Sequence, residues 1–360
     1  MKTFRFSLVA LVATTLFVAC SNDEVVEPIN SETQAISFRM QGGTPEITTR
    51  ALATTKSSIE AFLVYGSDYI TAPPTTTKLF DGLTVARQVD AADIFDYSPK
   101  KYYSMGAESA EFFAISPVSA IAGTTSNITG LDVTDLKTEA FFDYVVPKPD
   151  DTGNIVQEDL LVAGTSIATP SATAVSLDFQ HALSRIFVKA ANELSDDVVI
   201  KELTLKNLCA EGTLTGTPDP NPLSDPWEWA WSLQGDTTSY KYILAPTGVA
   251  VKAGEGVTSP GVYAPTLVTS MEQGMMVLPQ ITTNNDDDFL EGKEFALEVV
   301  YDVANLKNQV AHIAIADGFP FKMGIQYAIT IIFSGSDLIE INFVIGVANF
   351  ENDPTNTYPL

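Results

Sequence analysis

Apolar and polar residues alternate over short runs along this chain, and the first such run covers residues 36–40 (ISFRM). Ile36, Phe38 and Met40 share one face, and polar side chains lie between them. A period of two is typical of a half-buried β-strand. A second run, residues 59–65, is apolar on both faces, which is typical of a central strand. The pattern therefore predicts two successive strands joined by a polar loop.

Short strands of the same kind are predicted along the rest of the chain. They lie around residues 87–89, 102–104, 111–115, 141–146, 160–163, 199–205, 227–233, 241–244, 275–279, 294–303, 310–315, 326–333 and 338–350. Residues 71–77 (TAPPTTT) predict a loop, because proline cannot pair within a central strand. Residues 181–190 are the one segment that fits a helical turn. Many short strands with regular turn signals indicate an all-β sandwich or barrel.

The strand pattern starts again near residue 173, and each half of the chain opens with two strands. At roughly 100–200 residues per domain, a chain of 360 residues suggests two domains. We therefore expect a first domain over residues 34–173 and a second over residues 174–360. The last predicted strand carries one apolar face: Ile339, Ile341, Phe343, Ile345 and Val347.

The beginning of the chain has the pattern of an export signal. A short basic region precedes a mostly apolar run, residues 6–19, that is too short to span a bilayer. Small residues before Cys20 resemble a bacterial lipobox, in which the cysteine receives a diacylglyceryl group. We therefore expect a lipoprotein signal peptide over residues 1–19, a lipid on Cys20 and an acidic linker over residues 20–33. Such a precursor would be held at the cell outer membrane, because two or more acyl chains give stable anchoring.

The net charge of the chain limits the classes of partner that it can bind. Lys and Arg number 20 against 45 Asp and Glu, which gives a formal charge of −25. This acidity argues against nucleic acid as a partner and against electrostatic binding to anionic lipid. It suits a soluble, self-repelling surface protein.

The residue types needed for catalysis are sparse. His181 and His312 are the two histidines, and the motifs of nucleophile elbows, zinc proteases and nucleotide-binding loops are absent from the sequence. We expect His181 to be a hydrogen-bonded structural residue, His312 to belong to a strand and Cys209 to be a small packed residue. Residues 284–288 (NNDDD) lack the spacing of a calcium loop and predict a solvated turn. We therefore expect no enzymatic activity, no metal and no cofactor.

The tryptophans of the chain, Trp227, Trp229 and Trp231, recur with a period of two. That spacing places them on one face of a strand. An exposed row would be a stacking platform for a sugar or a protein ligand. Packing in the core or between domains is the alternative that we favour.

Several motifs together resemble the fimbrillin (Mfa-like) family of Bacteroidetes lipoproteins. The lipobox at Cys20 fits that family. So do seven segments of the chain: residues 36–40 (ISFRM) with the Thr-Arg-Ala loop at 49–51, 59–65 (IEAFLVY), 111–118 (EFFAISPV), 157–163 (QEDLLVA), 177–188 (LDFQHALSRIFV), 276–280 (MVLPQ) and 322–329 (KMGIQYAI). The C-terminal aromatic residue departs from the family pattern, because Asn349-Phe350 stands where Trp is common.

The resemblance implies a fold and a function. The fold would be two tandem transthyretin-like Greek-key β-sandwich domains, and the function a role in type V pili. In the stalk pilins of the family, an arginine-specific protease cuts in the loop after the first strand. Carried over, the cut falls between Arg50 and Ala51, and the departing strand carries Ile36, Phe38 and Met40. A strand from a neighbouring subunit would then enter, with the apolar face of residues 339–347 as the candidate donor.

The sequence leaves alternatives open. The leading hypothesis is a stalk or tip subunit of a fimbria, whose partners are other fimbrial subunits, self or homologous, and an arginine-specific protease. A pilus anchor subunit would keep Cys20 and the first strand. A lipid-anchored surface protein that binds a host glycan or protein, and is never cleaved, would use the tryptophan row as its contact face.

Overall fold

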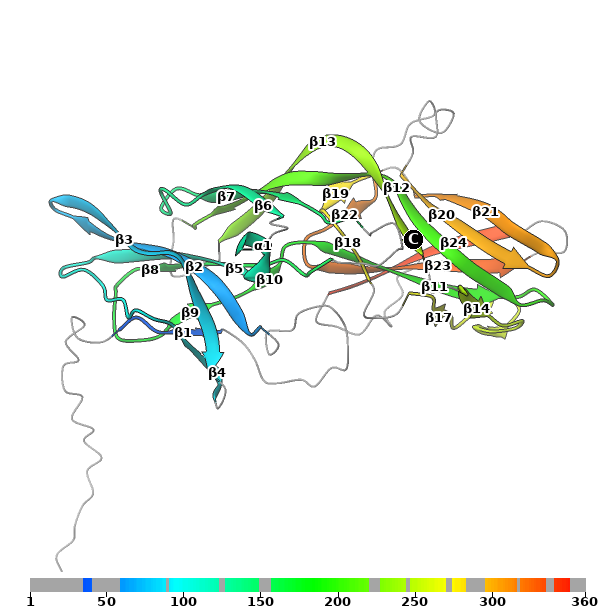
Figure 1. Ribbon diagram of the computed structural model, residues 1–360, viewed down its shortest axis with the longest axis horizontal. Helices are drawn as coiled ribbons and strands as arrows, with labels where there is room; N and C mark the ends of the chain where they lie inside the picture. Colours follow the sequence, from blue (N-terminus) through cyan, green and yellow to red (C-terminus); the bar gives the residue numbers. More distant parts are fainter. Residues whose placement is uncertain are drawn as a thin grey trace, which may run out of the picture.

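The computed structural model describes residues 35–40, 59–88, 91–122, 127–148, 157–219, 227–243, 247–269, 274–282, 295–315, 318–334 and 340–349, and within these only the backbone of 91–94, 122 and 340–349. Most of this part of the chain is β-strand, and the molecule is elongated (Figure 1). One short helix, α1 (Ser119–Ala122), occurs among the described residues. The prediction of an all-β protein is confirmed.

The first sheet is built from the beginning of the chain. It joins eight strands in the order β10 (Gln180–His181), β8 (Leu161–Ile167), β5 (Ser109–Ser116), β2 (Ala61–Thr71), β3 (Pro74–Gln88), β4 (Ala91–Asp96), β1 (Phe38–Met40) and β9 (Val175–Leu177). The sheet curves so that β9 also contacts β8, six strands away in this order. Most of the first sheet therefore wraps around one hydrophobic core.

Strand β2 lies between β5 and β3, as the two apolar faces of its sequence predict. Phe62 and Val64 belong to the core inside the first sheet. Leu63 and Tyr65 belong to a second, larger core on the opposite face. Both faces are buried because a different core covers each of them.

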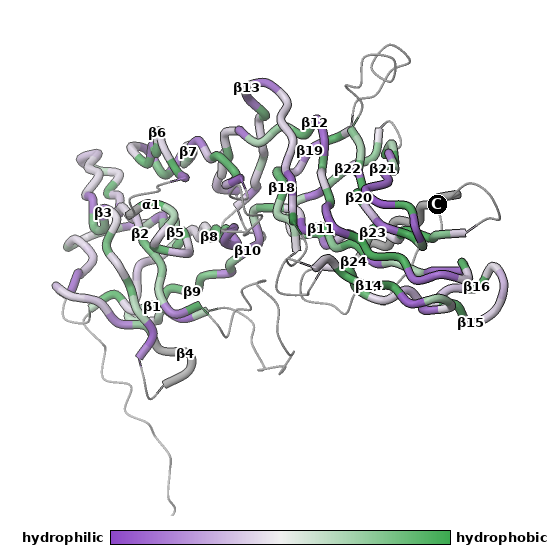
Figure 2. Tube along the Cα trace, turned by 45° about the vertical axis from the view of Figure 1, so that its right-hand side comes forward, coloured by the Kyte–Doolittle hydropathy of each residue, from purple (hydrophilic) through white to green (hydrophobic). Residues whose placement is uncertain are grey.

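Two further sheets form the rest of the molecule. One contains β21 (Leu306–Ala314), β20 (Ala296–Val303), β12 (Val198–Thr217), β7 (Ala140–Val145) and β6 (Ile128–Asp132), with β13 (Glu228–Ile243) and β14 (Val249–Val251) paired to β12. The other contains β17 (Thr266–Leu267), β11 (Ser184–Asn192), β23 (Ile325–Ser334) and β24 (Glu340–Asn349), with β18 (Met275–Val277) paired to β11. Two small sheets pair β15 (Val257–Ser259) with β16 (Val262–Tyr263) and β19 (Gln280–Ile281) with β22 (Pro320–Phe321). Figure 2 shows hydrophobic stretches in the strands of both halves.

The larger core is shared by the two halves of the chain. It contains Phe142 and Tyr144 of β7 together with Leu203 and Leu214 of β12. The long strand β12 pairs with β7 near one end and with β20 near the other. The domain boundary near residue 173 stays a prediction. Strands β9 and β10, which follow that boundary, pair within the first sheet.

Three local predictions are wrong. Residues 102–104 form no strand: the Ser104 amide donates to Asp68 Oδ2, at 2.5 Å, instead of to a ladder. Residues 71–77 continue a hairpin, in which Thr71 ends β2 and pairs with Pro74, the first residue of β3. A proline at the first position of a strand leaves no ladder donor missing. The expected helical turn at 181–190 is instead mostly β11, which pairs in parallel with β23.

Candidate functional site

The strand formed by the first apolar run, β1, is inserted between β4 and β9 (Figure 1). Phe38 pairs with Phe95 of β4 in an antiparallel ladder. On its other side β1 runs parallel to β9, and Phe38 lies opposite Val175. In sequence, the next described strand after β1 is β2, which lies three places away in the same sheet. Within the described chain, β1 is therefore held in the sheet by non-covalent contacts with strands that are distant in sequence.

Phe38 is the centre of an aromatic cluster. Its ring lies edge-on to Phe62, Phe80, Tyr97 and Phe112, with centroid distances between 5.3 and 6.1 Å. The side chain is 2% exposed. Edge-to-face pairs add about 0.5–1.5 kcal/mol each beyond the burial of apolar area. The alternation of apolar and polar residues predicts that this side chain points inward, and in the structure it packs in the core inside the first sheet.

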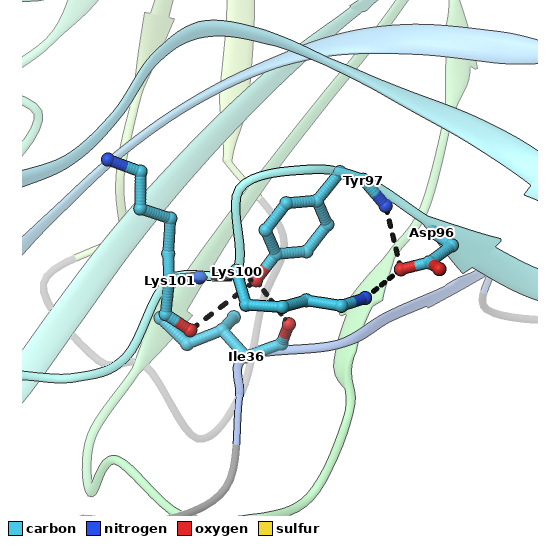
Figure 3. Close-up of polar contacts among 5 residues, drawn as sticks. All are labelled: Ile36, Asp96, Tyr97, Lys100 and Lys101. Atoms are coloured by element: carbon cyan, nitrogen blue, oxygen red, sulfur yellow. Dashed lines mark hydrogen bonds and ion pairs between the residues drawn. The ribbon is translucent and has the colours of Figure 1, made fainter.

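The backbone before Phe38 is held by a clasp on residues 97–101 (Figure 3). The Tyr97 hydroxyl donates to the Ile36 carbonyl oxygen at 2.6 Å. The Ile36 amide donates to the Lys101 carbonyl oxygen at 2.9 Å. Burial raises the pKa of Tyr97, so the hydroxyl keeps its proton and stays a donor at neutral pH. The clasp adds polar contacts that do not belong to the strand ladders.

The base of the clasp is fixed by Asp96. Its carboxylate accepts hydrogen bonds from the Lys100 ammonium group and, at 2.8 Å, from the Tyr97 amide. The Lys100 hydrogen bond and the Tyr97 amide hold the pKa of Asp96 below its usual value. Lys100 also lies over the Tyr97 ring, with its nitrogen 5.0 Å from the centroid. Asp96 and Lys100 are both exposed, so they orient Tyr97 more than they stabilise the fold.

We call the position that β1 fills the β1 seat: the edges of β4 and β9, the clasp of residues 97–101, and the rings that surround Phe38. Ile36 and Phe38 are buried in this seat, and Met40 is half-buried. Without β1, two strand edges and an aromatic core would face solvent. Unpaired edges beside apolar surface are a template for another strand. The seat is therefore suited chemically to hold an extended apolar peptide.

The expected donor strand is β24, of which the backbone is described. It pairs antiparallel with β23, from Ile325 opposite Asn349 to Ser334 opposite Glu340. Among the described strands, β23 is its one ladder partner. Four of the candidate residues lie within this ladder: Ile341, Phe343, Ile345 and Val347. The fifth, Ile339, lies outside the described residues.

The tryptophan row faces inward. Trp227 is 3% exposed and stacks on Phe113 with a centroid distance of 6.1 Å. Trp229 is half-buried and packs against the same ring at 5.9 Å. Trp231 is half-buried, and its indole N–H donates to the Ala182 carbonyl oxygen at 2.7 Å. The alternative of an exposed platform is therefore wrong, because this face of β13 packs against the hydrophobic core.

Glycines make room for this row. A Cβ atom on Gly164 would collide with the Trp227 ring, and one on Gly216 with the Trp229 ring. Trp229 lies directly opposite Gly216 in the ladder between β12 and β13. An aromatic ring over a strand glycine covers backbone that would otherwise be left without side-chain packing. The row is thus a packing device between the first sheet and β13.

Residues 157–188 supply buried polar groups near the junction of the two halves. Gln157 is 4% exposed, and its amide donates to the carbonyl oxygens of Pro147, at 3.0 Å, and Met276, at 3.2 Å. Its oxygen accepts a hydrogen bond from the Met276 amide at 2.8 Å. Gln157 therefore ties the segment before β8 to strand β18 of the second half.

The same region contains ionisable side chains. His181 Nδ1 lies 2.8 Å from Asp159 Oδ2, as expected for a structural histidine. Arg185 is fully buried, and its guanidinium lies 4.4 Å from the centre of the Phe187 ring. Burial lowers the pKa of Arg185 to about 10, and the charge of Asp159 opposes this effect. Arg185 therefore remains charged at neutral pH. No periodic pattern along residues 157–188 predicts this cluster.

The remaining candidate residues fall into two groups. Cys20, Arg50, Ala51 and residues 284–288 lie outside the described residues. Cys209 is buried, as expected, and His312 lies on β21. Within the part of the chain that the structure describes, His, Cys, Asp and Glu side chains form no group suited to a metal ion. The same part contains no helix of the length and hydropathy that a membrane span requires.

Comparison with known proteins gives one family and a set of distant folds. A family profile described as fimbrillin-like matches residues 49–346. The chain is similar to solved structures of candidate cell adhesion proteins from Bacteroides uniformis (14% identity over 88% of this chain and 97% of that chain, TM-score 0.48) and Bacteroides ovatus (12%, 89% and 99%, TM-score 0.49). It is also similar to the C-terminally truncated tip fimbrial protein Mfa3 from Porphyromonas gingivalis (10%, 87% and 98%, TM-score 0.40). No curated protein sequence matches the chain.

Proposed function

The chain belongs to the fimbrillin-like family, and from this premise we propose that it is a stalk or tip subunit of a cell-surface fimbria in which β1 gives way to a strand of another subunit. The observation that carries the proposal is the β1 seat. A strand of three residues fills an aromatic core between two strands that are remote from it in sequence. This strand can leave without breaking any covalent connection within the rest of the sheet.

The loop after β1 is where the switch would act. A cut between Arg50 and Ala51 would separate β1 from β2 while leaving every other strand on one chain. Before the cut, β1 occupies the seat and prevents premature pairing at the edges of β4 and β9. After the cut, β1 would be held by its clasp, ladders and rings alone. An incoming strand at high local concentration could then replace it.

Export and maturation complete the proposal. The precursor would carry a lipid on Cys20 that holds it at the outer membrane until an arginine-specific protease cuts after Arg50. The mature subunit would begin at Ala51 and would no longer carry the lipid. Its donor strand would be β24, because β24 is the final described strand and pairs on one edge only within the described chain. Its partners would be other fimbrial subunits.

The family supports a structural role and not an enzymatic one. The alternative of an uncleaved binding protein rested on an exposed tryptophan row, and Trp227 is buried. An uncleaved pilus anchor would use the same seat in its closed form. The state of the N-terminus on the cell distinguishes these roles.

The experiment is N-terminal sequencing and mass analysis of the protein taken from its own cell surface. A terminus at Ala51 is expected, and Arg50→Ala should then abolish assembly while leaving export intact. Arg50→Lys is the matched control. It keeps the positive charge at position 50 but removes the arginine side chain that the protease requires, so it separates the need for arginine from the need for charge. A terminus blocked by lipid at Cys20 in all molecules would overturn the stalk and tip roles and leave an anchor or a lipid-tethered binding protein.

A further inference from the structure

We propose that an exposed loop beside β1, residues 100–106 (KKYYSMG), binds the acidic segment that precedes β1 in the same chain. We call it the basic loop. Lys101 would pair with carboxylates of that segment, and Tyr102 and Met105 would contact its apolar side chains. The segment is residues 23–32 (DEVVEPINSE), which lie outside the described residues. This contact depends neither on cleavage after Arg50 nor on strand exchange.

The basic loop carries a positive charge that is open to a partner. The Lys100 ammonium group is bonded to Asp96. The Lys101 ammonium group forms no hydrogen bond or ion pair with the described residues, and Figure 3 shows it directed away from Asp96. With 45 acidic and 20 basic residues in the chain, most of the surface repels an acidic peptide. Lys101 therefore marks one of the few places where such a peptide is attracted.

The same loop exposes apolar surface. Tyr102 is 47% exposed and Met105 is 77% exposed. Single apolar side chains on a surface need no explanation, but these two lie three positions apart in one loop. A tyrosine ring offers apolar area at low entropy cost, and a methionine adapts its shape to a partner. The loop thus combines a cation with apolar contact area.

The backbone of the basic loop is fixed in place. Tyr103 is buried, and its ring lies edge-on to Phe112 at 6.3 Å. The Ser104 amide donates to Asp68 Oδ2 at 2.5 Å, and the Ala107 amide donates to the Ser104 carbonyl oxygen at 3.0 Å. Since the backbone is held, binding to this loop costs little ordering entropy. A preorganised surface of this kind can bind a short peptide through few contacts.

The acidic segment reaches the first sheet at this loop. The Ile36 amide donates to the Lys101 carbonyl oxygen at 2.9 Å. Glu32 precedes Ile36 by four positions, so even a fully extended chain keeps it within about 13 Å of that residue. Covalent attachment gives the segment a high effective concentration at the basic loop. Contacts that would be too weak between separate molecules therefore suffice here.

The composition of the segment complements the loop. Residues 23–32 contain four carboxylates, at positions 23, 24, 27 and 32, and no basic residue. Val25, Val26 and Ile29 lie among them. Each exposed ion pair contributes little, but several carboxylates can serve Lys101 in turn while the apolar side chains cover Tyr102 and Met105. The bound segment would hold the backbone just before β1, so that β1 opens less often.

Cross-linking tests the contact in the chain from residue 20 onward, with Cys20→Ser. A carbodiimide joins a lysine to a carboxylate that touches it, and peptide mass spectrometry locates the new amide. We expect Lys101 to be linked to residues 23–32, with a severalfold lower yield in about 0.5 M salt, which screens exposed charges. In a mixture of isotope-labelled and unlabelled protein, both linked peptides should carry the same label. Links between unlike labels would place the acidic partner on a second copy, and the lack of any link at Lys101 would exclude the contact. Either result would overturn the proposal.

Charge reversal tests the effect on β1. Lys101→Glu should speed hydrogen exchange of the Ile36 amide by about threefold at low salt, the scale of one or two exposed ion pairs. Adding Glu27→Lys and Glu32→Lys to this variant should restore the parent rate. Lys78→Glu is the matched control, because Lys78 is an exposed lysine of the same sheet that already has an ion pair. Equal rates in all variants, or no rescue by the reversed segment, would overturn the hold on β1.

A third comparison tests the apolar half of the contact. Tyr102→Ser combined with Met105→Ser should lower the cross-link yield at Lys101 at least about twofold. Leu306→Ser combined with Val310→Ser on β21 is the matched control, since these side chains are 57% and 61% exposed. Equal thermal melting confirms that both double variants fold. Equal yields in the two would overturn the role of Tyr102 and Met105.

Discussion

Tyr97 shows how one side chain can join two segments that the chain order keeps apart. Its hydroxyl bonds to the Ile36 carbonyl oxygen, and its ring packs 5.9 Å from the Phe38 ring. The hydroxyl therefore holds the backbone just before β1, and the ring packs against the Phe38 side chain of β1. Removing the hydroxyl alone separates these two contributions.

We predict that Tyr97→Phe loosens β1 without unfolding the sheet. One buried hydrogen bond contributes about 1 kcal/mol. The local opening of β1 should therefore become more frequent by about fivefold, whereas global stability changes little. Hydrogen exchange at the Val175 amide, which donates to Ser37, measures this opening. Tyr103→Phe is a control on another buried tyrosine of the same core. Unchanged exchange at Val175 in the Tyr97 variant would contradict the role of the clasp.

Glu111 is a second residue whose surroundings set its behaviour. It lies on β5 with 8% of its surface exposed, and the Ser166 hydroxyl donates to its carboxylate at 2.5 Å. Burial raises its pKa to about 7, although the Ser166 hydrogen bond acts in the opposite direction. The folded protein therefore binds a proton at this site more tightly than the unfolded chain, whose glutamates have a pKa of about 4.3.

The sign of the pH effect follows from this difference. Below about pH 4, Glu111 is protonated in both the folded and the unfolded state, so it does not reduce the free energy of unfolding. As the pH rises from about 4.3 to 7, the unfolded state loses the proton first, and stability falls. We predict that Glu111→Gln is more stable than the parent by about 1–3 kcal/mol at pH 8 and about equal to it at pH 4. Urea unfolding at both values measures this, and a difference that does not vary with pH would contradict it.

At the scale of elements, the row of tryptophans and its glycines determine how β13 meets the first sheet. Gly164 of β8 lies opposite Phe113 of β5, and Trp227 stacks on that phenylalanine. The missing side chain at Gly164 is thus the space into which the indole packs. The φ angle of Gly164 is not in the positive range, so its backbone conformation is open to alanine. Only the contact with the Trp227 ring opposes the substitution.

We predict that Gly164→Ala destabilises the fold by about 1–3 kcal/mol, the usual cost of an overfilled core. Trp227→Leu should be destabilising by itself but should accept the alanine with little further loss. A double-mutant cycle in urea would then give a coupling energy of at least about 1 kcal/mol. Additive changes in the free energy of unfolding would show that the Trp227 ring and the methyl group added at position 164 do not compete for the same space.

The sequence predicts individual strands better than their partners. Alternation located β1, β5 and β7, and the two apolar faces of residues 59–65 predicted the central position of β2. The errors arose where distant contacts decide the structure, as at Ser104, which bonds to Asp68. The rings around Phe38 come from positions 62, 80, 97 and 112, and no local pattern brings these together. The inward face of Trp227 likewise depends on Gly164, which lies 63 positions earlier in the chain.

At the scale of the whole molecule, the larger hydrophobic core couples the two halves of the chain. Phe113 of the first sheet belongs to the same core as Leu203 of β12 and Ile329 of β23. Gln157 adds hydrogen bonds between the halves. Neither half encloses this core alone, so we expect the halves to stabilise one another.

We predict that the uncut protein unfolds in one cooperative thermal transition in spite of its length. Scanning calorimetry should give one peak, and near-ultraviolet circular dichroism should follow the same curve. Gln157→Ala should lower the midpoint of this single transition, because it leaves buried groups at Pro147 and Met276 unpaired. Two resolved peaks, with Gln157→Ala changing one of them, would show that the halves are thermodynamically separate.

The length and the pairing of strand β12 affect how the subunit responds to a pulling force. Its 20 residues, at about 3.3 Å each, extend over about 65 Å. It pairs with β7 near one end, with β20 near the other and with β13 over most of its length. Tension along this strand would act on covalent backbone and would shear many hydrogen bonds together, not one after another. In the filament proposed above, in which an exchanged strand joins the subunits, we therefore expect that strand to pull out before any subunit is pulled open.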